Sequence, residues 1–293
     1  MLSAPEFANQ VPVPFEIAGY PLSLPSRHPL LNYCDPRSPH YQPYREAGLI
    51  LVARALKNLH RSGTALDIGA NVGDSCALLH RHSDFDILCV EASDFFFPYL
   101  EENIRRHFSA HATARKAFVL PSRDQQPRGL FHYGGTAKPV NQPFGESGGG
   151  AAIADLIDEA GRLALLKLDI DGMDLEVIGA ALAGSELRAP LYFELELAGS
   201  GLAEIRDVGA RALALFETAR TAGYRTAFVW DDPGRFFGRI DLDGGMANAI
   251  NYMGHLQSRP VFGFDICLVH QSDQELAAEM KKLIAAEAVV PLP

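Results

Sequence analysis

The sequence lacks the features of several large classes of protein. Its 293 residues contain 26 lysines and arginines against 36 aspartates and glutamates, which gives a net charge of -10. Because phosphate binding depends on an excess of basic side chains, this composition argues against a general binder of nucleic acid or of anionic membranes. No run of eighteen apolar residues occurs, and no basic segment followed by a long apolar one opens the chain. We therefore expect a cytoplasmic protein that binds neither nucleic acid nor membrane.

Cysteine is also scarce. Its four copies, Cys34, Cys76, Cys89 and Cys267, are widely scattered, and all but Cys34 fall within predicted apolar strands or helices. Small core residues are distributed in this way, whereas a zinc site requires closely spaced cysteines and histidines, which are not visible here. Internal repeats and coiled-coil heptads are missing too. The pattern indicates free thiols in a reducing compartment.

The stretch ALDIGANVGDS, residues 65–75, is typical of a buried strand that runs into a glycine-rich turn and then a helix. The apolar run ends at Ile68, Asp67 lies near its carboxyl end, and Gly69 and Gly73 bracket the turn. Open α/β sheets bind ligands at this edge. The turn lacks the GxGxxG pattern of dinucleotide folds and the Gly-Lys-Ser/Thr of phosphate cradles, so a small ligand without a pyrophosphate is favoured. An ordinary tight turn between strand and helix has the same glycine pair.

A second apolar run, DILCVEAS at residues 86–93, ends near Glu91, about twenty residues beyond the glycine turn. A carboxylate in that position accepts hydrogen bonds from both hydroxyls of a ribose. The pairing of the turn with Glu91 therefore suggests a nucleoside ligand.

Three ordered segments resemble the S-adenosylmethionine-dependent methyltransferases, and more narrowly the FkbM family. They are LDIGANVGDS, the strand ending in Glu91, and LKLDIDGMDLEVIGAA at residues 166–181. The resemblance covers roughly residues 60 to 270. It implies one Rossmann-like α/β domain of about seven mostly parallel strands, with the last strand antiparallel and helices on both faces. It also implies an S-adenosylmethionine cofactor, S-adenosylhomocysteine as product, and O-methylation of a small-molecule or glycan acceptor, such as a sugar or a polyketide-like compound.

The expected cofactor contacts come from the glycine turn, the helix after it and the end of the second strand. The amino terminus of the helix at residues 74–80 favours the methionine carboxylate through its free N–H groups and its dipole. The expected cofactor-binding residues are Asp67, Gly69, Ala70, Asn71, Gly73, Asp74, Ser75, Glu91 and Ala92.

Candidate catalytic residues are carboxylates near the ends of two later strands. Asp169 and Asp171 alternate with Lys167 and share one side if the strand continues that far, and Glu194 and Glu196 share a face of the next strand. Buried carboxylates are costly unless they are bound or paired, so they point to a site.

We predict catalytic roles for Asp169, Asp171 and Glu194, either as a proton acceptor or as ligands of a divalent ion that acidifies the acceptor hydroxyl. No metal ligand is assigned. The alternative is that Asp169 and Glu194 cap helices or pair with Lys167 and Arg188, and His132 is the best placed histidine base.

The domain organisation expected is a proline-rich arm at residues 1–42, which packs on the main domain or a partner subunit, followed by a methyltransferase domain at residues 43–293. Residues 117–120 are predicted as the third strand. Variable loops are expected at 121–150, as a mobile lid or a disordered insertion, and at 231–262. The last helix, residues 274–286, has the composition of a surface cover or a dimer contact, so a homodimer is possible.

Two alternatives remain, one of architecture and one of function. A doubly wound dehydrogenase has a similar architecture but requires the GxGxxG turn that is missing here. A non-enzymatic nucleoside-binding or regulatory module would bind the cofactor without turnover.

Overall fold

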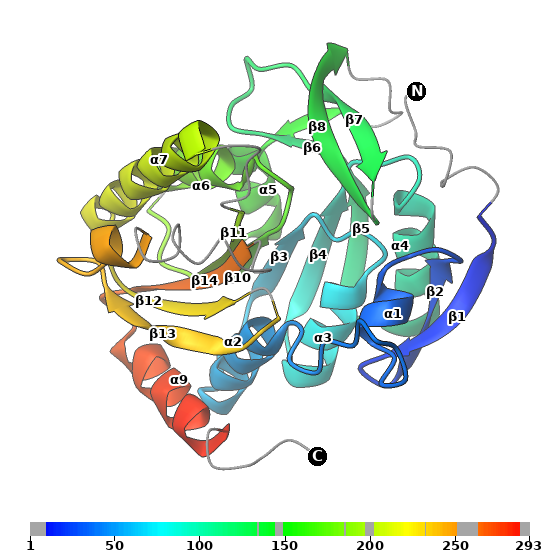
Figure 1. The fold of residues 1–293 in the computed structure, drawn as a ribbon, viewed down its shortest axis with the longest axis horizontal. Coiled ribbons are helices and arrows are strands. Elements are labelled where there is room, and N and C mark those ends of the chain that lie inside the picture. The colour runs from blue at the N-terminus through cyan, green and yellow to red at the C-terminus, as the bar shows by residue number, and fades with distance from the viewer. Residues whose placement is uncertain are drawn as a thin grey trace.

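The computed structural model describes residues 10–133, 135–143, 149–184, 186–196, 202–231, 233–250 and 263–287. It is built around one eight-stranded sheet (Figure 1). In spatial order the strands are β13 (Phe236–Asp241), β12 (Tyr224–Asp231), β14 (Gly263–His270), β11 (Leu191–Glu196), β10 (Leu163–Leu168), β3 (Thr64–Ile68), β4 (Asp86–Glu91) and β5 (Ala112–Lys116).

Strand directions follow the predicted pattern. The five strands β11, β10, β3, β4 and β5 are mutually parallel, whereas β14 runs antiparallel to both β11 and β12. The prediction of a mostly parallel α/β sheet with an antiparallel last strand is confirmed. The sheet has eight strands and not about seven, because β13 adds to its outer edge by pairing antiparallel with β12.

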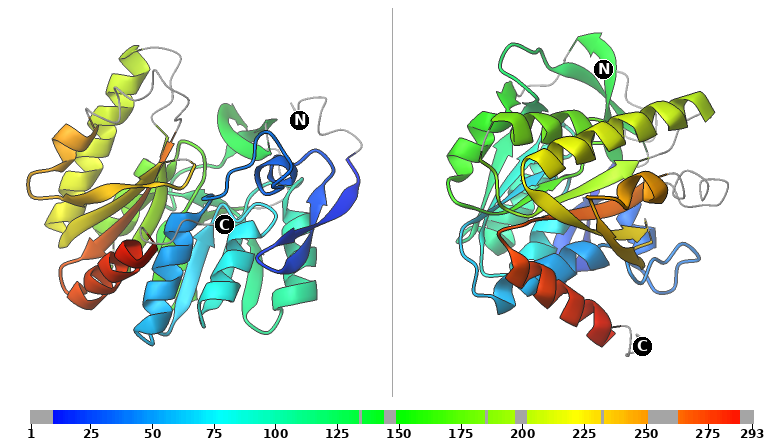
Figure 2. Two further views of the ribbon diagram at one scale, coloured as in Figure 1. Left: turned by 60° about the horizontal axis from the view of Figure 1, so that its bottom comes forward. Right: turned by 90° about the vertical axis from the view of Figure 1, so that its left-hand side faces the viewer.

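Helices cover both faces of the sheet (Figure 2). One layer consists of α2 (Ala47–Asn58), α3 (Asp74–His82), α4 (Phe97–Asn103) and α9 (Gln274–Glu287), and the other of α5 (Ile153–Ala160), α6 (Asp174–Gly184) and α7 (Leu202–Thr221). Each layer closes its own apolar core against the sheet. The central strands are buried on both sides, which explains near-continuous apolar runs such as LALLKL. None of the helices in the described ranges is long and apolar enough to cross a membrane.

The predicted third strand is wrong. The strand beside β4 is β5, whereas β6 (Phe118–Leu120) pairs with β9 (Gly150–Ala152) in a separate two-stranded sheet. The sequence ATARK of β5 exposes Thr113 and Arg115 because this strand lies at the edge of the sheet. The more apolar FVL segment therefore looked more like a core strand than the true one did.

The proline-rich stretch forms a hairpin of β1 (Pro12–Ile17) and β2 (Tyr20–Pro25), followed by the short helix α1 (Leu30–Tyr33). Leu22 and Leu24 are fully buried. The side chain of Asn103 accepts a hydrogen bond from the backbone N–H of Ser23 and donates one to its carbonyl oxygen, at 2.7 and 2.9 Å. These contacts hold the hairpin beside α4 (Figure 1). After α4 the chain continues into a π-helical turn at Ile104–Phe108.

Residues 121–150, expected to be an irregular loop, contain a second hairpin. Its strands are β7 (Arg128–Tyr133) and β8 (Thr136–Pro143), and the loop expectation is wrong for this part. Residues 134 and 144–148 of the expected loop, and residues 232 and 251–262 of the later one, lie outside the described residues. The rest of the later segment forms β13 and a turn that leads into a helical stretch.

Candidate functional site

The glycine turn after β3 packs directly against the chain that leaves β10. Gly69 has a φ of 78°, and a Cβ atom at this position would lie 1.8 Å from the carbonyl oxygen of Asp169. The amides of Gly69 and Ala70 both donate to the carbonyl oxygen of Val90, at 2.9 and 3.1 Å. Only glycine satisfies the dihedral angle and the close approach together. The turn therefore fixes the ends of β3, β4 and β10 relative to one another.

Replacing Gly69 with alanine is expected to destabilise the protein by roughly 3 kcal/mol, because positive φ and overlap with backbone both oppose the side chain. Gly19→Ala is the matched control, since Gly19 has a φ of 85° but no atom within 4 Å of the added Cβ. The control should lose only about 1 to 2 kcal/mol. Chemical denaturation measures both variants, and equal losses would show that the contact with Asp169 is unimportant.

A cavity of about 220 Å³ opens at this edge of the sheet. It is walled by the glycine turn, the carboxyl ends of β4, β10 and β11, the segment around α1 and the β7–β8 hairpin. Six of the nine predicted cofactor residues line it: Gly69, Asn71, Asp74, Ser75, Glu91 and Ala92. Asp67, Ala70 and Gly73 do not. The predicted catalytic residues Asp169, Asp171 and Glu194 line the same cavity.

Glu91 ends β4 with its carboxylate held in place by backbone amides. Its Oε2 accepts from the N–H of Asn71 at 2.9 Å and its Oε1 from the N–H of Ser93 at 2.8 Å. Burial raises the pKa of Glu91 above its ordinary value, although both hydrogen bonds act in the opposite direction. A carboxylate oriented in this way has lone pairs left for a ligand hydroxyl.

Asp67 lies behind the turn and supports it. The side chain is fully buried, accepts a hydrogen bond from the Ser75 hydroxyl at 2.6 Å and pairs with Lys167 at 3.2 Å. Lys167, on β10, lies 3.5 Å from Asp169 as well. Burial alone would lower the pKa of Lys167, but the Asp67 and Asp169 carboxylates outweigh it and raise the pKa. The predicted pairing of Asp169 with Lys167 is thus present. Asp67 supports the glycine turn through its contacts with Lys167 and Ser75.

The alternation expected through Lys167, Asp169 and Asp171 is wrong, because β10 ends at Leu168. The chain then turns, and Asp171 has a φ of 45°. Its carboxylate accepts from the Thr136 hydroxyl and lies 3.2 Å from Lys138, so the β7–β8 hairpin is tied to the end of β10. Burial and neighbouring Asp169 raise the pKa of Asp171.

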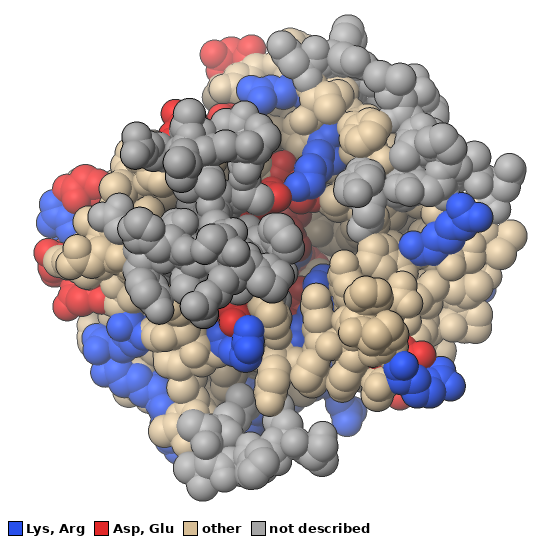
Figure 3. All heavy atoms as spheres, in the orientation of Figure 1, with Lys and Arg blue, Asp and Glu red and all other residues tan. Residues whose placement is uncertain are grey.

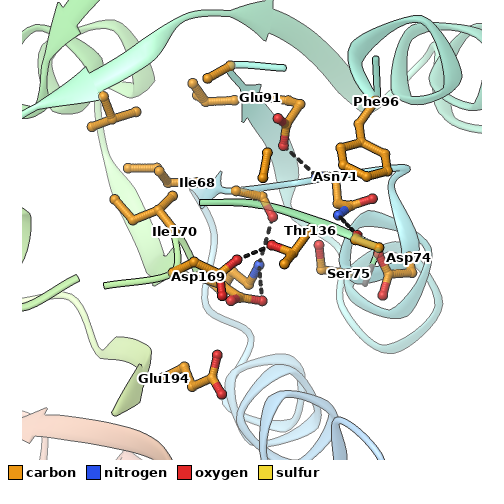
Figure 4. A pocket seen from close by; sticks show the side chains of 18 of the residues that line it. Ile68, Asn71, Asp74, Ser75, Glu91, Phe96, Thr136, Asp169, Ile170 and Glu194 are labelled. Atoms are coloured by element: carbon orange, nitrogen blue, oxygen red, sulfur yellow. Dashed lines mark hydrogen bonds and ion pairs between the residues drawn. The ribbon is translucent and has the colours of Figure 1, made fainter. Parts of the chain in front are cut away.

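Glu194 lies on β11 at the other end of the cavity from Glu91 (Figure 4). It faces Asp265 of β14 directly across the strands. Burial raises the pKa of Glu194 well above its usual range, and the Asp169 and Asp265 carboxylates raise it further. The predicted alternative partner, Arg188, pairs instead with exposed Glu186 at 3.8 Å. Figure 3 shows aspartate and glutamate atoms inside the hollow on this face of the molecule.

Several lining residues were missed at the level of sequence. His28 approaches the Asn71 side chain at 3.2 Å, and Asn71 in turn donates to the carbonyl oxygen of Gly135 at 2.8 Å. Arg45 and Glu46, just before α2, form an ion pair of 3.5 Å and line the cavity as well. No periodicity or motif marked these residues, which come from the proline-rich stretch, the segment before α2 and a hairpin turn.

His132, the predicted alternative base, does not line the cavity. Its Nε2 lies 2.6 Å from the Ser93 hydroxyl, its side chain is buried, and burial lowers its pKa. Within the described ranges, no group of three or more histidine, cysteine, aspartate or glutamate side chains is arranged to hold a metal ion.

The sequence matches no protein-family model and no curated protein. Among solved structures, the chain is similar to TYW2 of M. jannaschii in complex with AdoMet, with 11% identity, a TM-score of 0.45, and 90% of this chain and 88% of that chain covered. It is also similar to a putative O-methyltransferase from Klebsiella pneumoniae, with 14% identity, a TM-score of 0.42 and coverages of 76% and 80%.

A third similar structure is the geranyl diphosphate C-methyltransferase from Streptomyces coelicolor A3(2), in complex with Mg2+, geranyl diphosphate and S-adenosyl-L-homocysteine. Its identity is 9%, its TM-score 0.39, and 71% of this chain and 72% of that chain are covered. Likenesses at this level concern the overall fold and assign no ligand. The strand order and directions are those of a Rossmann-like α/β sheet in which β14 runs antiparallel between β11 and β12.

Proposed function

We propose that this protein is an S-adenosylmethionine-dependent methyltransferase that methylates a hydroxyl group of a small-molecule or glycan acceptor. One observation carries the proposal: a single cavity joins the glycine turn, the carboxylate that ends β4, and carboxylates of β10 and β11. Because the strands lie in the order β4-β3-β10-β11, these groups follow one another along one edge of the sheet. Open α/β sheets bind their ligands at this edge.

The cofactor end of the cavity suits the parts of the nucleoside. Glu91 is placed to accept from ribose hydroxyls, as proposed from the sequence. Apolar side chains for a flat base are supplied nearby by Val90, Phe118 and Met173, all of which line the cavity. The amino terminus of α3 begins at Asp74, where free N–H groups favour the methionine carboxylate.

The bound cofactor would supply an electrophilic methyl group on a sulfonium. The chain itself has to hold the acceptor oxygen in line with that carbon and keep water away, and positioning of this kind accounts for much of the rate. We assign Asp169 to the middle of the cavity, between Glu91 and Glu194 (Figure 4). Asp171 and Glu194 are assigned to the acceptor side. Asp169 lies 3.5 Å from Lys167, which fixes the carboxylate in this position.

Calorimetry with S-adenosylhomocysteine tests the cofactor assignment. We expect micromolar binding to one site and no measurable binding of NAD, because the turn lacks the pyrophosphate pattern of dinucleotide folds. The reverse preference would refute the proposal and favour a dehydrogenase. Release of S-adenosylhomocysteine from S-adenosylmethionine in the presence of hydroxyl compounds then separates an enzyme from a module that binds without turnover. Repeating the assay with EDTA shows whether an added divalent ion takes part.

A further inference from the structure

Four carboxylates line the acceptor side of the cavity, and three of them have a cation close by. Glu46 lies 3.5 Å from Arg45, Asp169 lies 3.5 Å from Lys167, and Asp171 lies 3.2 Å from Lys138. In the part of the chain that the structure describes, no lysine, arginine or histidine lies within 4 Å of Glu194. Glu194 therefore differs from the other three in what balances its charge.

A second carboxylate lies opposite Glu194 on the neighbouring strand. Glu194 and Asp265 are directly opposite each other on the antiparallel strands β11 and β14, where Cβ atoms are typically about 5 Å apart. Glu194 lines the cavity, whereas Asp265 is not among the residues that line it. Two carboxylates at this distance in a buried setting do not both ionise readily, and one proton shared between them relieves the repulsion.

We propose that Glu194 and Asp265 form a carboxyl pair that holds one proton, and that Glu194 receives the proton lost by the acceptor hydroxyl during methyl transfer. This inference rests on the proposed methyltransferase function for its second half. Asp265 is a positioning residue in this scheme, because it acts through Glu194.

The step balances without another reactant. The acceptor oxygen gains the methyl carbon as the sulfur–carbon bond breaks, and the sulfur keeps the electron pair of that bond. The acceptor O–H bond breaks, and its proton goes to an ionised oxygen of Glu194 while Asp265 keeps the shared proton. The positive charge on sulfur and the negative charge on Glu194 disappear together, so the step leaves the net charge of the cavity unchanged.

The surroundings of the pair support a raised affinity for protons. Burial and the Glu46 and Asp169 carboxylates raise the pKa of Asp265 well above its usual range, against the influence of the Tyr192 hydroxyl. The charged and titratable groups around the pair are Asp169 and Asp171 after β10, Asp174 of α6, Arg45 and Glu46 before α2, Lys167 of β10, Lys138 of β8, and Tyr192 and Glu196 of β11. Carboxylates outnumber cations among them.

Thermal unfolding between pH 5 and pH 9 tests the pair without cofactor or acceptor. A carboxyl whose folded pKa is raised stabilises the folded state at low pH, and this contribution is lost as the pH rises through the folded pKa. Asp265→Asn removes the repulsion, so its gain in Tm over the wild type should be smaller at pH 5 than at pH 8, where it should reach roughly 2 to 4 °C. Glu194→Gln should behave alike, and the double variant should gain little more than either single one.

Glu196→Gln is the matched control, because Glu196 lies on the same strand and face but 3.1 Å from Lys138. It should show no gain at pH 8. If Asp265→Asn does not change the Tm, or changes it equally at every pH, the proposed carboxyl pair is wrong.

Turnover with S-adenosylmethionine, using catechol, glucose and glycerol as hydroxyl probes, tests the proton transfer. Glu194→Gln should lower kcat by roughly a hundred- to ten-thousandfold, with unchanged affinity for S-adenosylhomocysteine. Asp265→Asn should have the kcat of the wild type at high pH. The acidic limb of its kcat/KM profile should move to lower pH, and the loss of a purely structural residue would not cause such a shift. Near-wild-type turnover in Glu194→Gln would overturn the base assignment. If the wild type turns over none of the probes, the proposed function and the proton transfer fail together, while the unfolding result still decides the pair.

Discussion

Glu91→Ala is expected to weaken the binding of S-adenosylhomocysteine by roughly thirty- to a hundredfold, or about 2 to 3 kcal/mol. The variant would lose the proposed charge-assisted contact to two ribose hydroxyls, and no other carboxylate ends β4. It also leaves the amides of Asn71 and Ser93 without their acceptor. Calorimetry on the purified variant measures the change in dissociation constant.

Two controls separate the ribose contact from damage to the turn. Glu91→Gln keeps the shape of the side chain and one acceptor oxygen, but its NH2 group would face one of the two backbone N–H donors, so it should lose part of the affinity and part of the stability. Glu101→Ala removes an exposed carboxylate from nearby α4 and should change neither. A dissociation constant unaltered in Glu91→Ala would refute the assignment of Glu91 to the cofactor.

Lys167→Met should lower the free energy of unfolding by about 3 to 5 kcal/mol, because it leaves the fully buried Asp67 carboxylate without its cation. The effect should appear at neutral pH, since the raised pKa of Lys167 means that the pair stabilises the fold at every pH below the ordinary lysine pKa and weakens only under strongly basic conditions. Denaturation in urea measures the loss.

The compensating variant Asp67→Asn/Lys167→Met should recover much of this stability, because it removes the buried charge together with its partner. Lys57→Met, which breaks an exposed ion pair with Asp84, should cost at most about 1 kcal/mol. If Lys167→Met behaved like Lys57→Met, the buried ion pair would not be holding the turn in place.

The strands and the glycine turn were predictable because their signals are local. An apolar run, two glycines and a carboxylate after the next run indicate where β3, β4 and Glu91 lie, and six residues predicted from them line one cavity. The same local pattern does not say which way a side chain points. The central strands are buried on both faces, and the Asp67 side chain contacts Lys167 and Ser75 inside the protein. The next two residues of the chain, Ile68 and Gly69, line the cavity.

The remaining walls of the cavity come from parts of the chain that are far away in sequence. His28 and Gly135 reach the glycine turn only through tertiary contacts, and neither belongs to a periodic pattern. The edge strand β5 was missed because its exposed Thr113 and Arg115 gave it a weaker apolar signal than the neighbouring segment. Asp265 gave no signal either, because its importance depends on the register between β14 and β11.

Asn71 joins three regions that are distant along the chain. Its contacts with His28, Glu91 and Gly135 span 43, 20 and 64 residues. Closing such long loops is entropically costly, so contacts of this kind form late in folding, after the local elements and the central sheet. We therefore expect the part of the cavity wall around Asn71, His28 and Gly135 to be among the last parts to assemble and among the first to open on heating. Ligand binding should then be lost at a lower temperature than the one at which the whole fold unfolds.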